Sequence, residues 1–305
     1  MNQTTPADFK ILLYYKYVNV ENTELTTYEH LSVCKALGLL GRIYIAHEGI
    51  NGTCAGTSEQ VDKYIKYMRK HPLFNEIEFK VDYAASMPFR KLFVRVRPEL
   101  AALDRPDLDP KKDTGTHLSP RAFHDMLLND PDAIAFDGRN NYEAAIGKFN
   151  NAVTPDIANF RDLPDALNQY EDIKDKKILM YCTGGIRCEK ASTLLKEQGF
   201  KNVYQLKGGI IKYGQEIPES ESLYKGKCFV FDDRIAVPIT QDILSTCTHC
   251  DTACDRYLNC TNASCNKLFL CCDACNETHQ HACSKSCSLT PRSTWKREDT
   301  VLATA

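Results

Sequence analysis

The sequence has 305 residues, of which 43% are hydrophobic and 26% charged, proportions that exclude a disordered or fibrous chain and indicate an ordinary globular protein. At roughly 150 residues per domain this length predicts two or three domains, and we expect three. The formal net charge of -2 excludes an overall basic field, so any contact with nucleic acid must come from a local patch.

The first residues, MNQTTPADFK, are polar and lack the charged-then-apolar order of a secretory signal. No later stretch approaches the ~20 apolar residues that span a bilayer, so we expect a cytoplasmic protein with no membrane partner. The 15 cysteines are an odd number, and a reducing compartment disfavours disulfides. Metal ligation and thiol chemistry are therefore the better interpretations of this cysteine content.

The first segment, residues 1–100, alternates strand-like and helix-like stretches. The apolar periodicity predicts strands at 11–18, 42–46, 50–55, 77–81 and 92–96, and helices at 25–40 and 58–71, with Ser58 as the N-cap. This order is that of a ferredoxin-like (acylphosphatase-like) α+β domain with one extra strand. Residues 101–116 are rich in Asp, Pro and Lys and lack apolar periodicity, which predicts a linker.

The second segment, residues 117–217, has the pattern of an α/β domain. We expect helices at 121–128, 187–198 and 210–215, and strands at 133–136, 177–181 and 203–206. Alternating strands and helices imply a mainly parallel sheet, with the active site at the carboxyl ends of its strands. Cys182 directly follows the strand 177–181 and so lies at such an end.

Cys182 opens a loop that combines the features expected of a reactive thiolate. The loop continues through Thr183, Gly184, Gly185, Ile186 and Arg187, and a helix begins within the same turn. Glycines let backbone N–H groups point inward, and a helix N-terminus carries about half a positive charge, which together lower the pKa of a thiol. Arg187 is placed to bind an anionic group beside the sulfur. The alternative is a buried structural cysteine beside a glycine-rich turn.

Cys188 follows this loop immediately. Cys188 is near enough to Cys182 in sequence to act as a resolving or second redox thiol. The alternative is that its side chain points from the helix into the core and has no chemical role.

The third segment, residues 218–305, holds 11 of the 15 cysteines and few aliphatic residues. It therefore has too little apolar surface to fold alone and needs cross-links such as bound metal ions. Eight of these cysteines, including two CxxC pairs, have spacings suited to two four-thiolate metal sites. We expect two structural zinc ions, because a closed thiolate site leaves no open coordination position, with an iron–sulfur cluster as the alternative. The expected ligands are Cys247, Cys250, Cys260, Cys265, Cys272, Cys275, Cys283 and Cys287.

The spacing leaves open which four cysteines share an ion, since both a sequential and a cross-braced arrangement are compatible with it. Five further residues are possible substitute ligands: Cys254, Cys271, His249, His279 and His281.

The loop 182–187 resembles the six-residue active loop of the rhodanese family, which begins with a persulfide-forming cysteine and frequently ends in arginine. The segment Phe136-Asp137-Gly138-Arg139 resembles the Asp-x-Arg strand end of the same family. For Asp137 and Arg139 we favour an ion pair that holds the sheet edge. The resemblance implies a rhodanese-like fold for residues 117–217.

Four motifs together resemble the rhodanese-domain-containing tRNA uridine-34 hydroxylases: HEGINGT (47–53), PFRKL (88–92), CTGGIRCEK (182–190) and FVFD (229–232). This resemblance implies oxygen-dependent 5-hydroxylation of the wobble uridine, with Cys182 as the catalytic residue, tRNA as the partner and O2 as cosubstrate. The sequence contains no flavin or nucleotide motif and does not identify the electron donor.

A local basic patch is consistent with an RNA substrate. Arg90, Lys91, Arg95 and Arg97 surround the strand 92–96 and, with neighbouring phenylalanines, are the candidate phosphate-contacting and base-stacking surface. The alternative is a solvated strand face. Further site candidates are His47, Glu48 and Asn51. The alternative is that this segment only forms a turn, for which Gly49 and Gly52 are needed.

Two other functions fit the same motifs. The loop alone suggests a rhodanese-type sulfurtransferase or persulfide carrier. An assay for sulfur transfer from thiosulfate to an acceptor would reveal that activity. A non-catalytic zinc and rhodanese scaffold is the second alternative, but such scaffolds usually lack the loop cysteine, and Cys182 is present.

Overall fold

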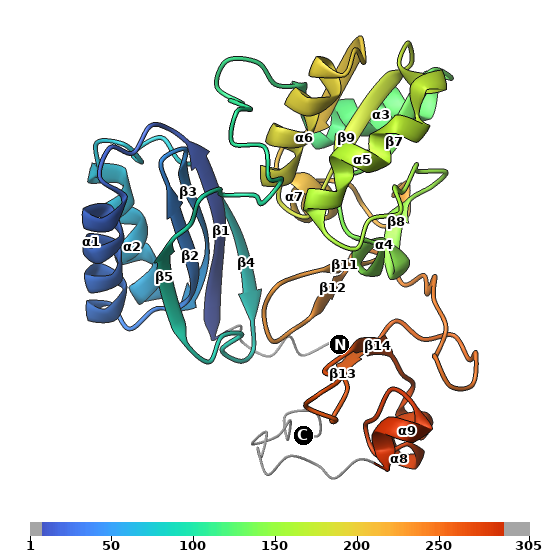
Figure 1. Ribbon diagram of the computed structural model, residues 1–305. Coiled ribbons are helices and arrows are strands. Elements are labelled where there is room, and N and C mark those ends of the chain that lie inside the picture. Colours follow the sequence, from blue (N-terminus) through green and yellow to red (C-terminus); the bar gives the residue numbers. More distant parts are fainter. Residues whose placement is uncertain (1–7, 290–305) are drawn as a thin grey trace.

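The computed structural model describes residues 8–289, which form three regions beside one another (Figure 1). The expected first and third segments extend beyond these residues, and most of the polar N-terminal stretch lies outside them. Within residues 8–289, no helix is both long and apolar enough to cross a membrane.

The N-terminal region is a five-stranded sheet with two helices, in the strand order β4-β1-β3-β2-β5. β2 and β5 run parallel, and the other neighbours are antiparallel. This is the predicted ferredoxin-like order with an extra edge strand. Its elements are β1 (Phe9–Tyr17), α1 (Thr23–Ala36), β2 (Leu40–Ala46), β3 (Gly49–Gly56), α2 (Ser58–Lys70), β4 (Phe79–Ala84) and β5 (Leu92–Val96).

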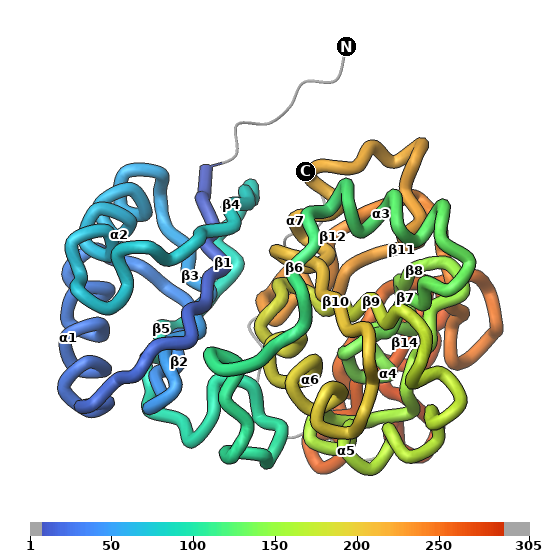
Figure 2. Tube along the Cα trace, turned by 90° about the horizontal axis from the view of Figure 1, so that it is seen from above, coloured from blue at the N-terminus to red at the C-terminus, as the bar shows by residue number. Residues whose placement is uncertain are grey.

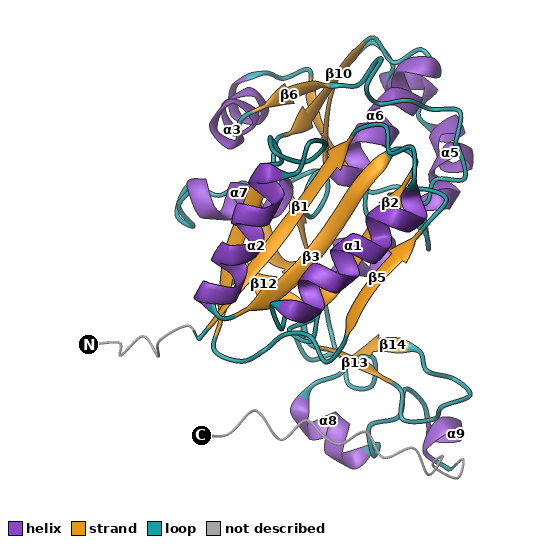
Figure 3. Cartoon of the chain, turned by 90° about the vertical axis from the view of Figure 1, so that its left-hand side faces the viewer, coloured by secondary structure: helices purple, strands orange, loops and turns teal. Residues whose placement is uncertain are grey.

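Both helices cover the same face of this sheet (Figure 3). Because side chains alternate along a strand, Leu12 and Tyr14 of β1 pack into the core beneath the helices, whereas Leu13 and Tyr15 point to the open face. The prediction of Ser58 as the cap of α2 was wrong by one residue. Thr57 is the N-cap, and its side chain and that of Gln60 bond reciprocally to each other's backbone N–H.

The second region is built on a parallel four-stranded sheet of order β6-β10-β9-β7, which confirms the predicted parallel sheet. Ile178 and Met180 of β9 and Leu194 of the following helix contribute to its core. The principal elements are β6 (Thr116–Leu118), α3 (Pro120–Asn129), β7 (Ala133–Asp137), β9 (Lys177–Tyr181), α6 (Ile186–Glu197), β10 (Asn202–Leu206) and α7 (Gly209–Glu216).

Several elements of this region are too short to produce a periodic signal in the sequence, and none of them was predicted. They are α4 (Asn141–Ala145), β8 (Gly147–Phe149), η1 (Phe160–Asp162), α5 (Leu163–Ala166), η2 (Leu167–Gln169) and η3 (Glu171–Ile173).

The segment from residue 97 to residue 115 joins the two regions without forming a helix or strand. It is nevertheless anchored, because Leu103 and Leu108 are buried in the core of the second region. Figures 1 and 2 both show the N-terminal sheet lying beside the second region, with this segment passing between them. The open face of the sheet is therefore turned toward the second region.

The third region begins as part of the second. β11 (Tyr224–Phe229) pairs with both β8 and β12 (Ala236–Pro238) in a three-stranded sheet. The cysteine-rich part follows as β13 (Tyr257–Asn259), β14 (Leu268–Leu270), α8 (Asp273–Thr278) and α9 (Lys285–Ser288). Its small core consists mainly of cysteine, with Phe269 and Ala282. So little apolar material agrees with a segment that depends on metal binding to fold.

Candidate active site and metal centres

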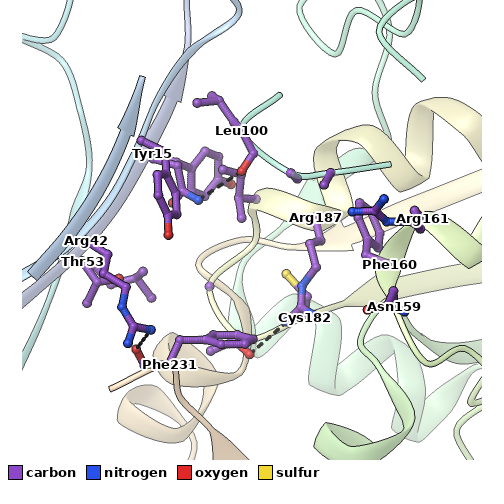
Figure 4. Close-up of a pocket in the computed structure, with 18 of the residues that line it drawn as sticks. Tyr15, Arg42, Thr53, Leu100, Asn159, Phe160, Arg161, Cys182, Arg187 and Phe231 are labelled. Carbon is purple, nitrogen blue, oxygen red and sulfur yellow. Dashed lines mark hydrogen bonds between the residues drawn. The ribbon is translucent and has the colours of Figure 1, made fainter. Parts of the chain in front are cut away.

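A cavity of about 360 Å³ lies between the open face of the N-terminal sheet and the loop that starts at Cys182 (Figure 4). Aromatic side chains of both regions form much of its wall, and three arginines, Arg42, Arg161 and Arg187, also line it. Arg42 donates a hydrogen bond to the backbone oxygen of Phe231 at 2.9 Å, which joins the two sides of the cavity. The aromatic lining residues are Tyr15, Tyr44, Phe89, Phe160 and Phe231.

Cys182 lies at the carboxyl end of β9 and is only 1% exposed. The N–H of Gly185 donates to its Sγ at 3.1 Å. Gly185 has a φ of +105°, and a Cβ atom there would come within 2.8 Å of the Tyr15 hydroxyl. A Cβ on Gly184 would lie 2.6 Å from Leu13. The positive φ thus favours glycine at position 185, and both glycines let the loop pack closely against β1.

The environment of Cys182 stabilises its thiolate. Burial acts to raise the pKa of Cys182, but a hydrogen bond from the Cys188 thiol, the charge of Arg187 and two backbone N–H groups lower it to about 5. Burial raises the pKa of Cys188 well above its usual range. At neutral pH the loop therefore holds one thiolate, at Cys182, beside one thiol.

Arg187 is held by a buried carboxylate of the short helix α4. Its guanidinium donates to both oxygens of Glu143, at 2.6 and 2.8 Å, and Glu143 is fully buried. This bidentate pair engages Nη1 and Nη2, and Arg187 also lines the cavity. Binding of an anionic group by Arg187 therefore stays a prediction, and its guanidinium is a fixed positive charge near Cys182. The helix that carries Glu143 was not predicted.

A second buried carboxylate, Glu189, joins three parts of the molecule. The Tyr15 hydroxyl donates to its Oε1 at 2.9 Å, and Nε2 of His117 lies 2.9 Å from the same atom. The Lys80 ammonium group lies 4.5 Å from the centre of the Tyr15 ring, and burial lowers the pKa of Lys80 to about 8. Sequence reasoning missed these contacts, since Tyr15 and Glu189 are 174 residues apart.

Asp137 and Arg139 form the predicted ion pair, with Arg139 Nη2 donating to Asp137 Oδ2 at 2.7 Å. Both side chains are fully buried, so the pair lies inside the fold and not at an exposed sheet edge. Arg139 also donates to the backbone oxygen of Gly147 at 2.7 Å. The pair thereby ties the end of β7 to β8.

The candidate RNA-contacting residues divide into two groups. Arg95 and Arg97 are exposed on the open face of the N-terminal sheet, where their guanidinium groups lie 4.6 Å from the Phe93 ring and 5.0 Å from the Tyr44 ring. Because Tyr44 also lines the cavity, Arg97 lies next to the cavity wall. Arg90 is exposed but paired with Asp233 at 2.9 Å, and Lys91 is exposed.

The HEGINGT segment makes structural contacts, and two of its residues, Asn51 and Thr53, line the cavity. Glu48 accepts a hydrogen bond from the N–H of Leu100 at 2.6 Å and pairs with the fully buried Lys190 at 3.0 Å. Asn51 lines the cavity and donates to the backbone oxygen of Leu100 at 3.3 Å. His47 bonds to the backbone oxygen of Val20.

All eight predicted metal-ligating cysteines come together in two groups of four, and the atoms of each group lie within 4.8 Å of one another. The arrangement is cross-braced, because each group takes two cysteines from each half of the segment. One group is Cys247, Cys250, Cys272 and Cys275. The other is Cys260, Cys265, Cys283 and Cys287.

The sulfur spacings in these groups fit a tetrahedral ion. Four metal–sulfur bonds of about 2.3 Å give sulfur–sulfur edges of about 3.8 Å. The spacing is 3.7 Å between Cys250 and Cys272, 3.6 Å between Cys265 and Cys283, and 3.8 Å between Cys283 and Cys287. Both groups could therefore hold metal ions. The possible substitutes lie outside both groups: Cys254, Cys271, His249, His279 and His281.

Comparison with protein families divides the chain in three. Residues 9–100 match the UPF0176 acylphosphatase-like domain, residues 119–216 the rhodanese-like domain, and residues 225–288 the rhodanase C-terminal domain. Among solved structures, a rhodanese-like domain from an Anabaena protein aligns with 37% of this chain and 80% of its own, at 23% identity and a TM-score of 0.31. That score is too low to support an argument, and the fold assignment rests on the family matches.

Curated relatives match almost the full length. A tRNA uridine(34) hydroxylase from Cytophaga hutchinsonii is 46% identical over 287 residues, which cover 93% of this chain and 91% of the relative. One from Bacillus mycoides is 44% identical over 293 residues, covering 94% and 92%. Identity of this extent across nearly the whole of both chains shows that the protein belongs to the tRNA uridine(34) hydroxylase family.

Proposed function

We propose that this protein hydroxylates C5 of the uridine at wobble position 34 of tRNA, with Cys182 as the catalytic nucleophile. One observation carries the proposal: the thiolate of Cys182 lies in a cavity whose opposite wall is built by aromatic side chains of another domain. The cavity volume of about 360 Å³ falls within the range of small-molecule sites, about 300 to 1,000 Å³. A single nucleoside is a substrate of suitable size and shape for such a site.

The cavity suits a base that has left its stack. Proteins that read single-stranded RNA loops splay bases out and stack them on aromatic side chains. Tyr15, Tyr44 and Phe160 offer such surfaces, and Arg42 and Arg161 offer positive charge to the flanking phosphates. Arg90, Lys91, Arg95 and Arg97 are proposed to extend this contact along the anticodon stem-loop.

The chemistry needs both a nucleophile and protons. Insertion of one oxygen atom of O2 into the C5–H bond, with reduction of the other atom to water, consumes two electrons and two protons. The electrons come from an external two-electron reductant, a role that a dithiol can fill in an assay. Addition of the Cys182 thiolate to the electron-poor C6 of uracil raises the electron density at C5, where oxygen is inserted. Loss of the C5 proton and departure of the thiolate from C6 then restore the C5–C6 double bond and free Cys182.

The cysteine groups are proposed to hold two structural zinc ions. Thiolates are the ligands that zinc favours, and four of them leave no position for a substrate. When bound, the metal supplies folding energy to the cysteine-rich segment and takes no part in the reaction. We place the protein in the cytoplasm, where its tRNA substrate and reduced thiols occur together.

Nucleoside mass spectrometry tests this function. Purified protein is incubated with dithiol and air, using tRNA from cells that lack wobble-uridine hydroxylation, and a parallel sample is kept anaerobic. The expected product is uridine 34 with one added oxygen, formed in air only. Cys182→Ala should abolish the product, whereas Cys34→Ala, which changes a buried cysteine of the N-terminal core, should retain it.

Sulfur transfer is the second candidate function, because the loop of Cys182 belongs to a rhodanese-like domain. Transfer of sulfur from thiosulfate to an acceptor thiol or to a base, with no oxygen added to uridine, would replace the hydroxylase assignment.

A further inference from the structure

Three hydrogen-bonded side chains connect the cavity with solvent. Tyr15 lines the cavity, and its hydroxyl donates to Glu189 Oε1 at 2.9 Å. Nε2 of His117 lies 2.9 Å from the same oxygen. Glu189 is 7% exposed, whereas the His117 side chain is 40% exposed. The series therefore runs from the cavity wall, through a buried carboxylate, to the protein surface.

We infer that Tyr15, Glu189 and His117 form a proton relay that supplies protons to the oxyanion developing in the cavity. The inference rests on the proposed hydroxylase function and adds a general acid to it. Tyr15 gives its phenolic proton to the oxyanion, one proton passes from His117 Nε2 through Glu189 Oε1 to the Tyr15 oxygen, and water reprotonates His117. Each passage moves one proton and no electrons.

A route of this kind is needed because the other groups beside the sulfur have no proton to spare. Cys182 is a thiolate at neutral pH, the Cys188 thiol donates its proton to Cys182 in a hydrogen bond and its pKa is raised well above its usual range by burial, and the Arg187 guanidinium is bound to Glu143. General acids must lie within hydrogen-bonding reach of the atom that they protonate. Tyr15 meets this condition, because it lines the cavity and its hydroxyl lies against the loop at Gly185.

The environment keeps each member in the required state. Burial acts to raise the pKa of Glu189, but the hydrogen bond with His117 is the largest of several contacts that lower it, and the net shift is downward. The hydrogen bond with Glu189 raises the pKa of His117, which favours its protonated form. Burial and the nearby Glu189 raise the pKa of Tyr15 well above its usual range, so the phenol keeps its proton until a strong base forms beside it.

Neighbouring groups hold the carboxylate in place. Gln205 Nε2 and Thr114 Oγ1 each donate to Glu189 Oε2 at 3.1 Å, which leaves Oε1 to Tyr15 and His117. The other charged or titratable groups that face the relay are Lys80, Tyr17, Cys182 and Cys188 at Tyr15, and Lys207 and Glu78 at His117.

Two variants and one matched control test the relay in the full-length, metal-loaded protein. Tyr15→Phe should lower kcat for hydroxyuridine formation by about 100-fold or more, a typical contribution of a general acid, with KM for tRNA little changed. His117→Ala should also lower kcat, and added imidazole should restore it, since the exposed site admits the free base. Tyr17→Phe should keep the wild-type rate. Tyr17 is the next residue on the same face of β1, and its buried hydroxyl has no hydrogen-bond partner within the described residues.

The outcomes separate the relay from the function on which it rests. Wild-type protein that forms no hydroxyuridine refutes the hydroxylase assignment and the relay with it. An active wild type with full kcat in Tyr15→Phe, or with no imidazole rescue of His117→Ala, overturns the relay alone. A merely structural role for Tyr15 would raise KM or lower the melting temperature without the selective loss of kcat.

Discussion

The reactivity of Cys182 should depend on pH in a way that separates it from an ordinary thiol. With a pKa of about 5 the sulfur is ~99% thiolate at pH 7, whereas a cysteine of pKa about 8.5 is ~3% thiolate. The sign follows from the lowered pKa: the thiolate persists above pH 5 and is lost as the pH falls through that value. Lowering the pH from 7 to 5 should therefore halve the rate of alkylation by iodoacetamide, compared with a fall of about 100-fold for an ordinary thiol.

The charge of Arg187 is the part of this effect that a variant can remove. An opposite charge within a few ångströms lowers the pKa of an acid by about 1 to 3. The variant Arg187→Met, combined with Glu143→Gln so that no buried carboxylate is left unpaired, should raise the pKa of Cys182 by that amount. Arg187→Lys keeps the positive charge and serves as the control, with the midpoint expected to stay close to the wild-type value.

Mass spectrometry of the peptide that contains Cys182, after timed alkylation between pH 4 and pH 10, gives the midpoint directly. A wild-type rate that continues to rise between pH 8 and pH 9 would contradict the proposed thiolate. A midpoint that is the same in the double variant and in the wild type would show that the Arg187 charge does not set the pKa.

Three further predictions concern stability, metal and RNA. Lys190→Met leaves Glu48 and Glu99 facing each other without their shared cation, and should lower the free energy of unfolding in urea by about 3–5 kcal/mol. Lys201→Met removes only an exposed pair with Asp175 and should leave the free energy of unfolding nearly unchanged. Elemental analysis should find two zinc ions per chain, fewer in Cys272→Ser, and still two in Cys271→Ser, whose cysteine lies outside both groups. Arg97→Gln should weaken tRNA binding and reduce the slope of log affinity against log salt by about 0.7, as measured by filter binding at several salt concentrations. Arg121→Gln, which changes an exposed arginine of α3 that pairs with Glu221, is the control and should leave the slope unchanged.

The sequence predicted those parts of the site that are encoded locally. The strand, cysteine, glycines and helix start of the loop are contiguous, so the pattern of residues 177–187 was enough to place Cys182 at a strand end. The eight cysteines were found in the same way, since ligand spacing is a property of short segments. Their cross-braced grouping depends on how β13 and β14 pair, and spacing alone could not distinguish it from the sequential arrangement.

The residues that complete the cavity were missed because they depend on contacts between domains. Arg42 and Phe231 are 189 residues apart, and nothing near Tyr15 or Glu189 marks them as partners. The pairing of Arg187 with Glu143 was missed for a related reason, since Glu143 lies on a helix of only five residues. Long-range packing thus determines which of the locally visible groups are free to react.

The cross-braced metal centres also impose an order on biosynthesis. Neither site can close on the first half of its ligands, because the first waits for Cys275 and the second for Cys287. A ribosome will therefore have released the two preceding domains, including the loop of Cys182, before either ion is fully enclosed. The eight thiols remain open to oxidation and to competing metals throughout that interval, so a cell short of the proper ion would accumulate chains whose first two domains are complete and whose last segment has never folded.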